Sequence, residues 1–295
     1  MAQEISSKDV ERWAQRAVEH CTQIRQTAGL LDSVSAPSYA SELRGEFRVG
    51  LPLGNRAFVN DDLTEWVWLA EGKKLSIRDA RVSEQAPGWM ELLREATGGS
   101  EVNVSTFTGS VAADPLVAAA DSRLVSVELV ATLPSLAVVP DGTPDVTLRN
   151  MTSRELREFL DITSSELAEQ QRGTHPGKSF EELQDRALKR ALRQLPDGVS
   201  TPGHELYSIV MNGRNAGGLW AQPDGPRVRV WSLVVYEEFR GRSYSRAALA
   251  QVASAMSFRG VRFMSVPLAA PNTHARSIFE SVGFTLARQN FKASF

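Results

Sequence analysis

Hydrophobic and polar positions repeat most regularly in the second half of the chain, where they predict alternating strands and helices. Helical spacing predicts helices at 153–171, 179–195, 243–257 and 273–282. Strand patterns are found at 146–149, 206–210, 216–221, 228–235, 262–267 and 285–291. Thr152 or Ser153 is the expected cap of the first helix, and Asn212-Gly213 predicts a tight type I′ hairpin turn. The order βααβββαβαβ predicts a mixed α/β sheet.

The first half shows a weaker pattern. Val10, Trp13, Ala17 and Ile24 recur at helical spacing and predict an amphipathic helix over 7–31. Prolines and glycines predict an irregular stretch over 32–60. Shorter strands are expected at 64–69, 74–77, 101–107 and 124–131, and shorter helices at 88–96 and 115–120.

The length of the chain and a segment rich in Pro, Gly and Asp together predict two domains. A chain of 295 residues is about twice the usual domain size. The segment Val138–Asp145, rich in Pro, Gly and Asp, is the expected linker. We therefore expect a smaller N-terminal α/β domain at 1–140 and a second domain at 145–295.

Composition narrows the classes of partner. With 42% hydrophobic and 23% charged residues, the chain is typical of a globular protein. Its 33 basic and 35 acidic residues nearly cancel, so neither nucleic acid nor a membrane is an expected partner. The single cysteine, Cys21, offers no disulfide and no metal cluster. No signal core and no run of roughly 18 apolar residues is present, which predicts a cytoplasmic protein without a metal.

A turn after the long strand 228–235 carries the first candidate chemistry. It reads Arg240-Gly241-Arg242-Ser243-Tyr244-Ser245 and leads into a helix. Small residues let a ligand approach the backbone, and the first amides of a helix favour an anion. Two arginines would strengthen a diphosphate site. A solvent-facing turn with two arginines is the alternative.

About thirty residues later, the segment Asn272–Phe284 opens the next helix. Together the two segments resemble the GNAT N-acetyltransferase superfamily. The matches in type and order are Arg240, Gly241, Asn272, Ala275, Gly283 and Phe284. Gly218-Leu219-Trp220 looks like the third strand of such domains. The resemblance covers residues 145–295 and implies the GNAT acyl-CoA N-acyltransferase fold.

This resemblance implies acetyl-CoA as co-substrate, bound where two neighbouring strands splay apart. Backbone groups of Leu233, Val234 and Val235 would meet the pantetheine arm, and amides of Arg240–Ser245 would receive the pyrophosphate. Asn272 and Phe279 would line the thioester end. The implied reaction transfers an acetyl group to an amine of a small molecule or peptide, and the protein would be a monomer or homodimer.

Several positions depart from the family pattern. Ser243 and Ser245 stand where glycines are usual, and Phe279 stands where a Tyr is thought to act as general acid. Ser243 could cap the helix in place of the glycine. The strand positions Ser232 and Val234 lack the carboxylates found in relatives. An alternative function is therefore a CoA-binding regulatory or scaffold module with lost or weak catalysis.

The remaining catalytic candidates are Tyr236, Glu237 and Glu238 at the end of the long strand. His204 has a suitable pKa for proton transfer, but a hydrogen-bonded structural role is the preferred interpretation. Tyr207 could also supply a phenol.

In the N-terminal half, residues 86–136 weakly resemble the end of a GNAT domain. One interpretation is a degenerate, non-catalytic copy in tandem with the second domain. The other is an unrelated α+β domain.

Overall fold

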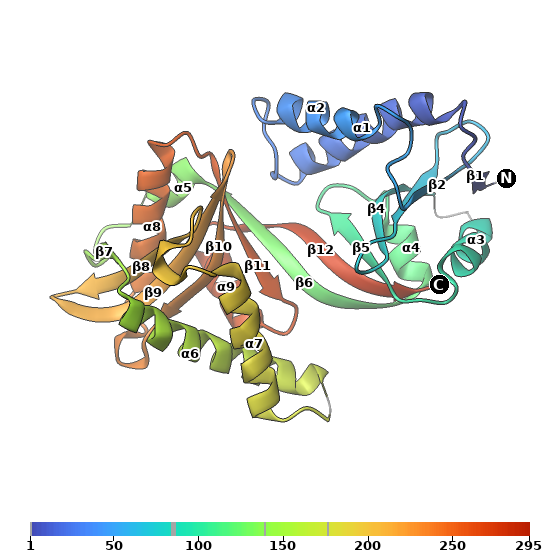
Figure 1. Cartoon of the computed structure of the whole chain (residues 1–295). Helices are drawn as coiled ribbons and strands as arrows, with labels where there is room; N and C mark the ends of the chain where they lie inside the picture. The colour runs from blue at the N-terminus through green and yellow to red at the C-terminus, as the bar shows by residue number, and fades with distance from the viewer. Residues whose placement is uncertain (1, 84–86, 139, 176) are drawn as a thin grey trace. The chain divides into compact units, whose positions relative to one another are not determined.

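The computed structural model describes residues 2–83, 87–138, 140–175 and 177–295. These form two compact units, Met1–Glu128 with Leu286–Phe295, and Leu129–Thr285 (Figure 1). The linker expected at Val138–Asp145 includes Val139, and the segment 86–136 begins at Ala86; both of these residues lie outside the described part. The domain ranges 1–140 and 145–295 remain a prediction. No described helix has both the length and the apolar character that a membrane crossing requires.

The second unit follows the predicted element order. Its helices are α5 (Leu133–Ala137), α6 (Ser153–Gln171), α7 (Phe180–Gln194), α8 (Tyr244–Ser257) and α9 (Thr273–Ser281). Its strands are β7 (Thr147–Asn150), β8 (Glu205–Met211), β9 (Arg214–Asp224), β10 (Arg227–Val235) and β11 (Phe263–Ala269). Single-turn 3₁₀ helices lie at η1 (Arg172–Thr174), η2 (Gly198–Ser200) and η3 (Glu237–Phe239). Helix α5 and the three 3₁₀ helices were not predicted.

Local sequence signals explain the ends of these elements. Thr152 begins α6 with a capping box, in which its hydroxyl accepts from the Glu155 amide and the Glu155 carboxylate accepts from the Thr152 amide. Ser179 and Glu182 begin α7 in the same way. Asn212 and Gly213 both have positive φ, 48° and 76°, which confirms the tight hairpin turn between β8 and β9.

The strands of the second unit lie in the order β11-β10-β9-β8-β7. Helix α6 packs against α7 and β10 and buries a hydrophobic cluster on the sheet. That cluster includes Met151, Phe159, Leu206, Trp220 and Val234. Helix α8 contacts β10 and β7.

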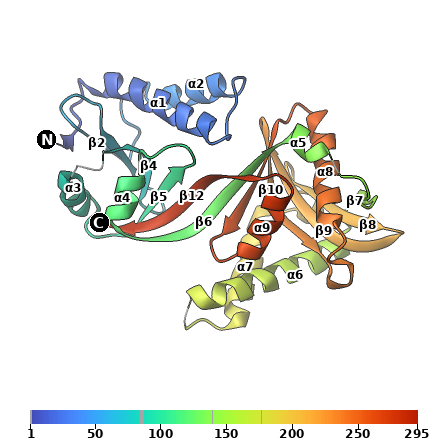
Figure 2. The same cartoon turned by 180° about the vertical axis from the view of Figure 1, so that it is seen from behind.

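The first unit has the same order of elements. Its strands are β1 (Gln3–Glu4), β2 (Asn55–Val59), β3 (Trp66–Ala70), β4 (Ser76–Arg81), β5 (Val102–Phe107) and β6 (Asp121–Thr132), the last of which crosses the boundary between the units. Its helices are α1 (Val10–Thr27), α2 (Ala36–Glu46), α3 (Pro87–Thr97) and α4 (Asp114–Ala119). Figure 2 shows α1 and α2 together beside β2 and β4.

The expectation of an irregular stretch over 32–60 was wrong. Helix α2 contains Pro37 in its first turn, where proline removes no intrahelical hydrogen bond. Strand β2 pairs with β3 and buries Ala57, Phe58 and Val59. Gly50 and Gly54, with φ of 101° and 71°, serve the turns between these two elements.

The last strand of the chain, β12 (Thr285–Ser294), lies mostly in the first unit. It pairs with β5 from Arg288↔Phe107 to Ala293↔Val102. Ala293 and Phe295 enter the hydrophobic core with Phe58, Val67 and Leu69 of that unit. Asn290 joins two neighbouring strands, accepting from Ser105 Oγ at 2.8 Å and donating to Ser126 Oγ at 3.1 Å. The C-terminal residues therefore complete the N-terminal sheet.

Candidate active site

Strands β10 and β11 part shortly after they pair. Their parallel register joins Arg227–Arg229 to Phe263–Ser265 and ends there. On the other edge of β10, pairing with β9 continues to Val235↔Gly217. From residue 231 to 235, one edge of β10 thus offers backbone amides and carbonyls that its β11 neighbour does not use.

A β-bulge lies where the strands part. Val230 pairs with Ala221 and Ser232 with Trp220, so Trp231 is the extra residue. The Trp231 ring stacks on Trp220 with centroids 5.5 Å apart, and its indole N–H donates to Gln222 Oε1 at 2.8 Å. The Arg229 guanidinium lies 4.6 Å from the centroid of the Trp231 ring. These contacts hold the bulge in one conformation.

Two glycines of β9 allow close packing against β10 and α6. A Cβ on Gly217 would lie 2.1 Å from the Val234 carbonyl oxygen. A Cβ on Gly218 would lie 2.5 Å from Met151 Cε and 2.6 Å from Phe159 Cδ2. Side chains at these positions would push β10 or α6 away from the sheet.

The turn after β10 is held by buried aromatic residues. Phe239 and Tyr244 are buried, with ring centroids 6.2 Å apart. Between them, Gly241 and Ser243 take positive φ values of 75° and 60°. Ser243 occupies the N-cap position of α8, but its side chain makes no cap hydrogen bond there. The Ser243 side chain therefore does not cap the first amides of α8, contrary to expectation. These amides form the electrostatically positive end of the helix.

Arg240 is fixed by contacts that sequence reasoning did not identify. Its Nε donates to the Val235 carbonyl at 3.0 Å, and Nη2 donates to Glu166 Oε1 of α6 at 2.8 Å. Arg246 donates to the Ser281 carbonyl at the end of α9, at 3.0 Å. Glu166 precedes Arg240 by 74 residues, so no local pattern could have revealed the pair.

Asn272 and Phe279 have clear structural contacts. Asn272 caps α9, with Oδ1 accepting from the Ala275 amide at 3.1 Å. Phe279 is buried and packs edge-to-face on Phe284, with centroids 5.2 Å apart. Their role in lining the thioester end stays a prediction.

The three catalytic candidates lie at the far end of β10. Tyr236 is half-buried; burial and then the nearby Glu158 charge raise its pKa above the ordinary value, so its phenol is neutral at pH 7. Glu237 and Glu238 are exposed, and Glu238 lies 3.8 Å from Arg214. Five residue steps separate Tyr236 from the bulged Trp231, roughly 16 Å along an extended strand. Their catalytic roles stay a prediction.

His204 and Tyr207 take part in hydrogen bonds within the unit. The Trp220 indole donates to His204 Nδ1 at 2.9 Å, which puts the proton of the neutral ring on Nε2. Burial lowers the pKa of His204 and favours that neutral ring. The Tyr207 hydroxyl donates to Glu205 Oε2 at 2.5 Å. Across the described ranges, no three His, Cys, Asp or Glu side chains gather into a metal-binding group.

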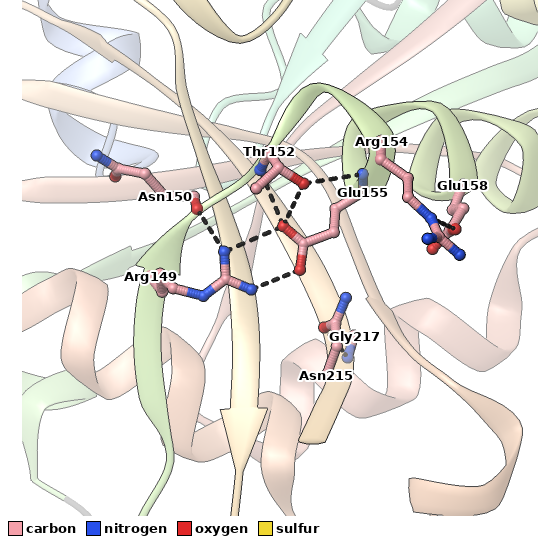
Figure 3. A network of polar contacts seen from close by, with 8 residues as sticks. All are labelled: Arg149, Asn150, Thr152, Arg154, Glu155, Glu158, Asn215 and Gly217. Atoms are coloured by element: carbon pink, nitrogen blue, oxygen red, sulfur yellow. Dashed lines mark hydrogen bonds and ion pairs between the residues drawn. The ribbon is translucent and has the colours of Figure 1, made fainter. Parts of the chain in front are cut away.

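A polar network fixes the start of α6 (Figure 3). Arg149 binds both carboxylate oxygens of Glu155, at 2.5 and 3.1 Å, and the second oxygen also accepts from the Thr152 amide at 2.8 Å. The Arg149 hydrogen bond is the main reason that the pKa of Glu155 falls to about 2. On β9, Asn215 Oδ1 accepts from the Gly217 amide at 3.2 Å. The contact between Arg149 and Glu155 ties the first turn of α6 to the end of β7.

Parallel strands that part, followed by a helix N-terminus with arginines, are the arrangement that the family resemblance predicts. Comparison with known proteins agrees with this prediction. The model of the acetyltransferase (GNAT) family matches residues 163–284. Bacillus subtilis (strain 168) YycN, named an uncharacterized N-acetyltransferase, is 31% identical over 145 residues, which are 47% of this chain and 92% of YycN. The chain belongs to the GNAT acetyltransferase family.

Two further relatives extend the comparison. YdgE of Bacillus subtilis (strain 168), also named an uncharacterized N-acetyltransferase, is 25% identical over 147 residues, 48% of this chain and 92% of YdgE. The crystal structure of a GCN5-related N-acetyltransferase from Sphaerobacter thermophilus shares the fold, with a TM-score of 0.53 and 18% identity. That similarity covers 100% of this chain and 95% of the other.

Proposed function

We propose that the second unit transfers an acetyl group from acetyl-CoA to an amine of a small molecule or peptide. The observation that supports this proposal most directly is that β10 and β11 separate after the pair Arg229↔Ser265. One edge of β10 is therefore open toward a positively charged turn. Family membership supports an acyltransferase. The acetyl donor and the amine acceptor are the proposed steps beyond it.

The residues present fit the coenzyme. Leu233, Val234 and Val235 would offer backbone groups to the pantetheine arm, as an additional strand would use them. The amides from Arg240 to Ser245 would receive the pyrophosphate. A Cβ at Gly241 would meet no atom within 4 Å, so the approach to the turn is open at that position. Asn272 and Phe279 complete the proposed site.

The reaction is a direct transfer. The amine nitrogen attacks the thioester carbonyl carbon, the C–N bond forms and the C–S bond breaks. The amine loses one proton and the departing thiolate gains one. Tyr236, Glu237 and Glu238 follow the end of β10, beside the turn proposed for the pyrophosphate and roughly 16 Å along the strand from the bulge, so they do not reach a thioester bound where the strands part.

We further propose that the first unit is a second, degenerate copy of the fold. It repeats the order βααβββαβαβ. Its parallel strands β4 and β5 pair at Ser76↔Asn103, as β10 and β11 pair at their starts.

Coenzyme binding and turnover test the proposal together. We expect CoA and acetyl-CoA to raise the melting temperature by several degrees at a hundredfold excess over Kd, which corresponds to about 2.7 kcal/mol. Arg242→Ala should weaken CoA binding about tenfold, because it removes a positive charge beside the backbone amides that are proposed to bind the pyrophosphate. Arg154→Ala, an exposed arginine on α6, is the matched control and should bind CoA normally. Absence of any CoA effect on the wild-type protein would refute the proposal.

A second candidate is a CoA-binding module without turnover. It is favoured by Phe279, which offers no proton and is buried against Phe284. Release of free thiol from acetyl-CoA, measured over a broad panel of amines, separates the two functions. The acetyltransferase requires thiol release with at least one amine, whereas intact CoA binding without release across the panel supports the module.

A further inference from the structure

Ser265 of β11 carries a buried hydroxyl without a partner. The residue is fully buried, and within the described ranges its Oγ has no hydrogen-bond partner. A buried polar group in this state has lost its water without a compensating bond. Such groups are rare in folded proteins, and a catalytic role is one explanation. Ser208 of β8 is in the same state and provides a comparison.

The position of Ser265 distinguishes it from Ser208. Ser265 forms the last register pair between β10 and β11, opposite Arg229. Residues opposite each other in a sheet share a face, so Ser265 lies on the face of Arg229, whose guanidinium stacks on Trp231. Ser208 pairs with Arg149 and Gly218 between strands that stay together.

The direction of the proposed coenzyme leads to this point. Its pyrophosphate would lie at Arg240–Ser245, beyond the end of β10, and its arm would run back along the open edge. Six residue steps from Val235 to Arg229 cover roughly 20 Å of extended strand. An extended arm of that reach would end where the strands meet, which would place the thioester next to Ser265.

We propose that the Ser265 hydroxyl donates a hydrogen bond to the carbonyl oxygen of the bound acyl thioester, which makes Ser265 a catalytic residue. This inference rests on the proposed function. During attack by the amine, negative charge builds on that oxygen while the C–N bond forms and the C–S bond breaks. The hydroxyl stabilises this charge without giving up its proton. Free CoA has no acyl oxygen, so the hydroxyl discriminates between acylated and free coenzyme.

Ser265→Ala and the control Ser208→Ala test this role by calorimetric titration with CoA and with acetyl-CoA. We expect the wild-type protein to bind acetyl-CoA about three- to tenfold more tightly than CoA, the usual range for one hydrogen bond. Ser265→Ala should abolish this preference, leave CoA affinity unchanged and lower kcat at least tenfold. Ser208→Ala should keep the preference and kcat. Neither variant should lower the melting temperature, because each removes an unpaired buried hydroxyl.

The outcomes separate the two proposals. If the wild-type protein binds both coenzymes but Ser265→Ala keeps the preference and kcat, the role of Ser265 is refuted while the proposed function stands. Equal binding of CoA and acetyl-CoA by the wild-type protein also refutes it. If the wild-type protein binds neither coenzyme, the proposed function fails and the inference fails with it.

Discussion

Among single residues, Ser243 shows how a departure from the family pattern is accommodated. It takes the left-handed conformation, with φ of 60°, at a position where the family resemblance implies glycine. A residue with a Cβ pays about 1–2 kcal/mol for that conformation. Its hydroxyl does not recover the cost by capping α8. The turn keeps the backbone path of a glycine at an energetic cost.

Ser243→Gly should therefore stabilise the protein. Relief of the left-handed strain outweighs the greater entropy of glycine in the unfolded chain, and we expect a net gain of roughly 0.5–1 kcal/mol in the free energy of unfolding. Urea unfolding measures it. Ser245→Gly, two residues further into the helix, is the control and should destabilise by a few tenths of a kcal/mol. Loss of stability in Ser243→Gly would show that the serine makes a compensating contact.

The sequence could predict some of the site residues but not their contacts. The two motifs pointed to the Arg240–Ser245 turn and the Asn272 helix because their residues adjoin in the chain. Glu166 and Ser265 were missed because each is brought to the site by a residue distant in sequence. Glu166 contacts Arg240, and Ser265 pairs with Arg229. A buried hydroxyl without a partner cannot be recognised from residue type alone.

Among the elements, the start of α6 depends on one carboxylate. Glu155 completes the capping box and also binds Arg149, whose hydrogen bond lowers the pKa of Glu155 from 4.5 to about 2. Because the pKa is lower in the folded state, the carboxylate adds stability above pH 4.5, and this stability is lost as pH falls toward 2.

We expect Glu155→Gln to lose roughly 1 kcal/mol at pH 7, a value discounted for the solvent exposure of Arg149. The difference from the wild-type protein should shrink as pH falls from 4.5 toward 2, because the wild-type carboxylate then becomes protonated. Urea unfolding at several pH values measures both effects. A difference independent of pH would mean that the Arg149 contact contributes nothing.

Element prediction succeeded where local signals agreed. Helices α6 and α7 begin at Ser/Thr caps with a glutamate three residues later, and both were located within a few residues. Helix α2 was missed because proline was taken as a break, although Pro37 lies in the first turn. Strand β2 was missed because glycines precede it and its five residues form too short a pattern.

At the scale of the whole molecule, the last strand of the chain, β12, belongs mostly to the first unit, although the segment before it forms the second unit. Sequence patterning predicted a strand at 285–291 but contained no information on its partner. The structure pairs β12 with β5, about 180 residues earlier in the chain, and Asn290 bonds Ser105 and Ser126 within the first unit. Strand pairing between distant segments depends on cross-strand contacts that no local window contains.

Asn290→Ala should therefore weaken the N-terminal unit. Two side-chain hydrogen bonds disappear, each worth about 0.5–1.5 kcal/mol, and two serine hydroxyls lose a partner. We expect the amides of β5 to exchange with solvent deuterium roughly tenfold faster, since about 1.4 kcal/mol corresponds to a factor of ten. Hydrogen exchange followed by mass spectrometry resolves β5 from the strands of the second unit.

The control for this experiment is Gln289→Ala, on the same strand, where no side-chain hydrogen bond is recorded among the described residues. It should leave exchange in β5 unchanged. The amides of β8, β9 and β10 should keep their protection in both variants, because the bonds of Asn290 end on strands of the first unit. Faster exchange in β8 to β10 with β5 unaffected would contradict this division. In that case the final strand would support the acyltransferase unit rather than the N-terminal sheet.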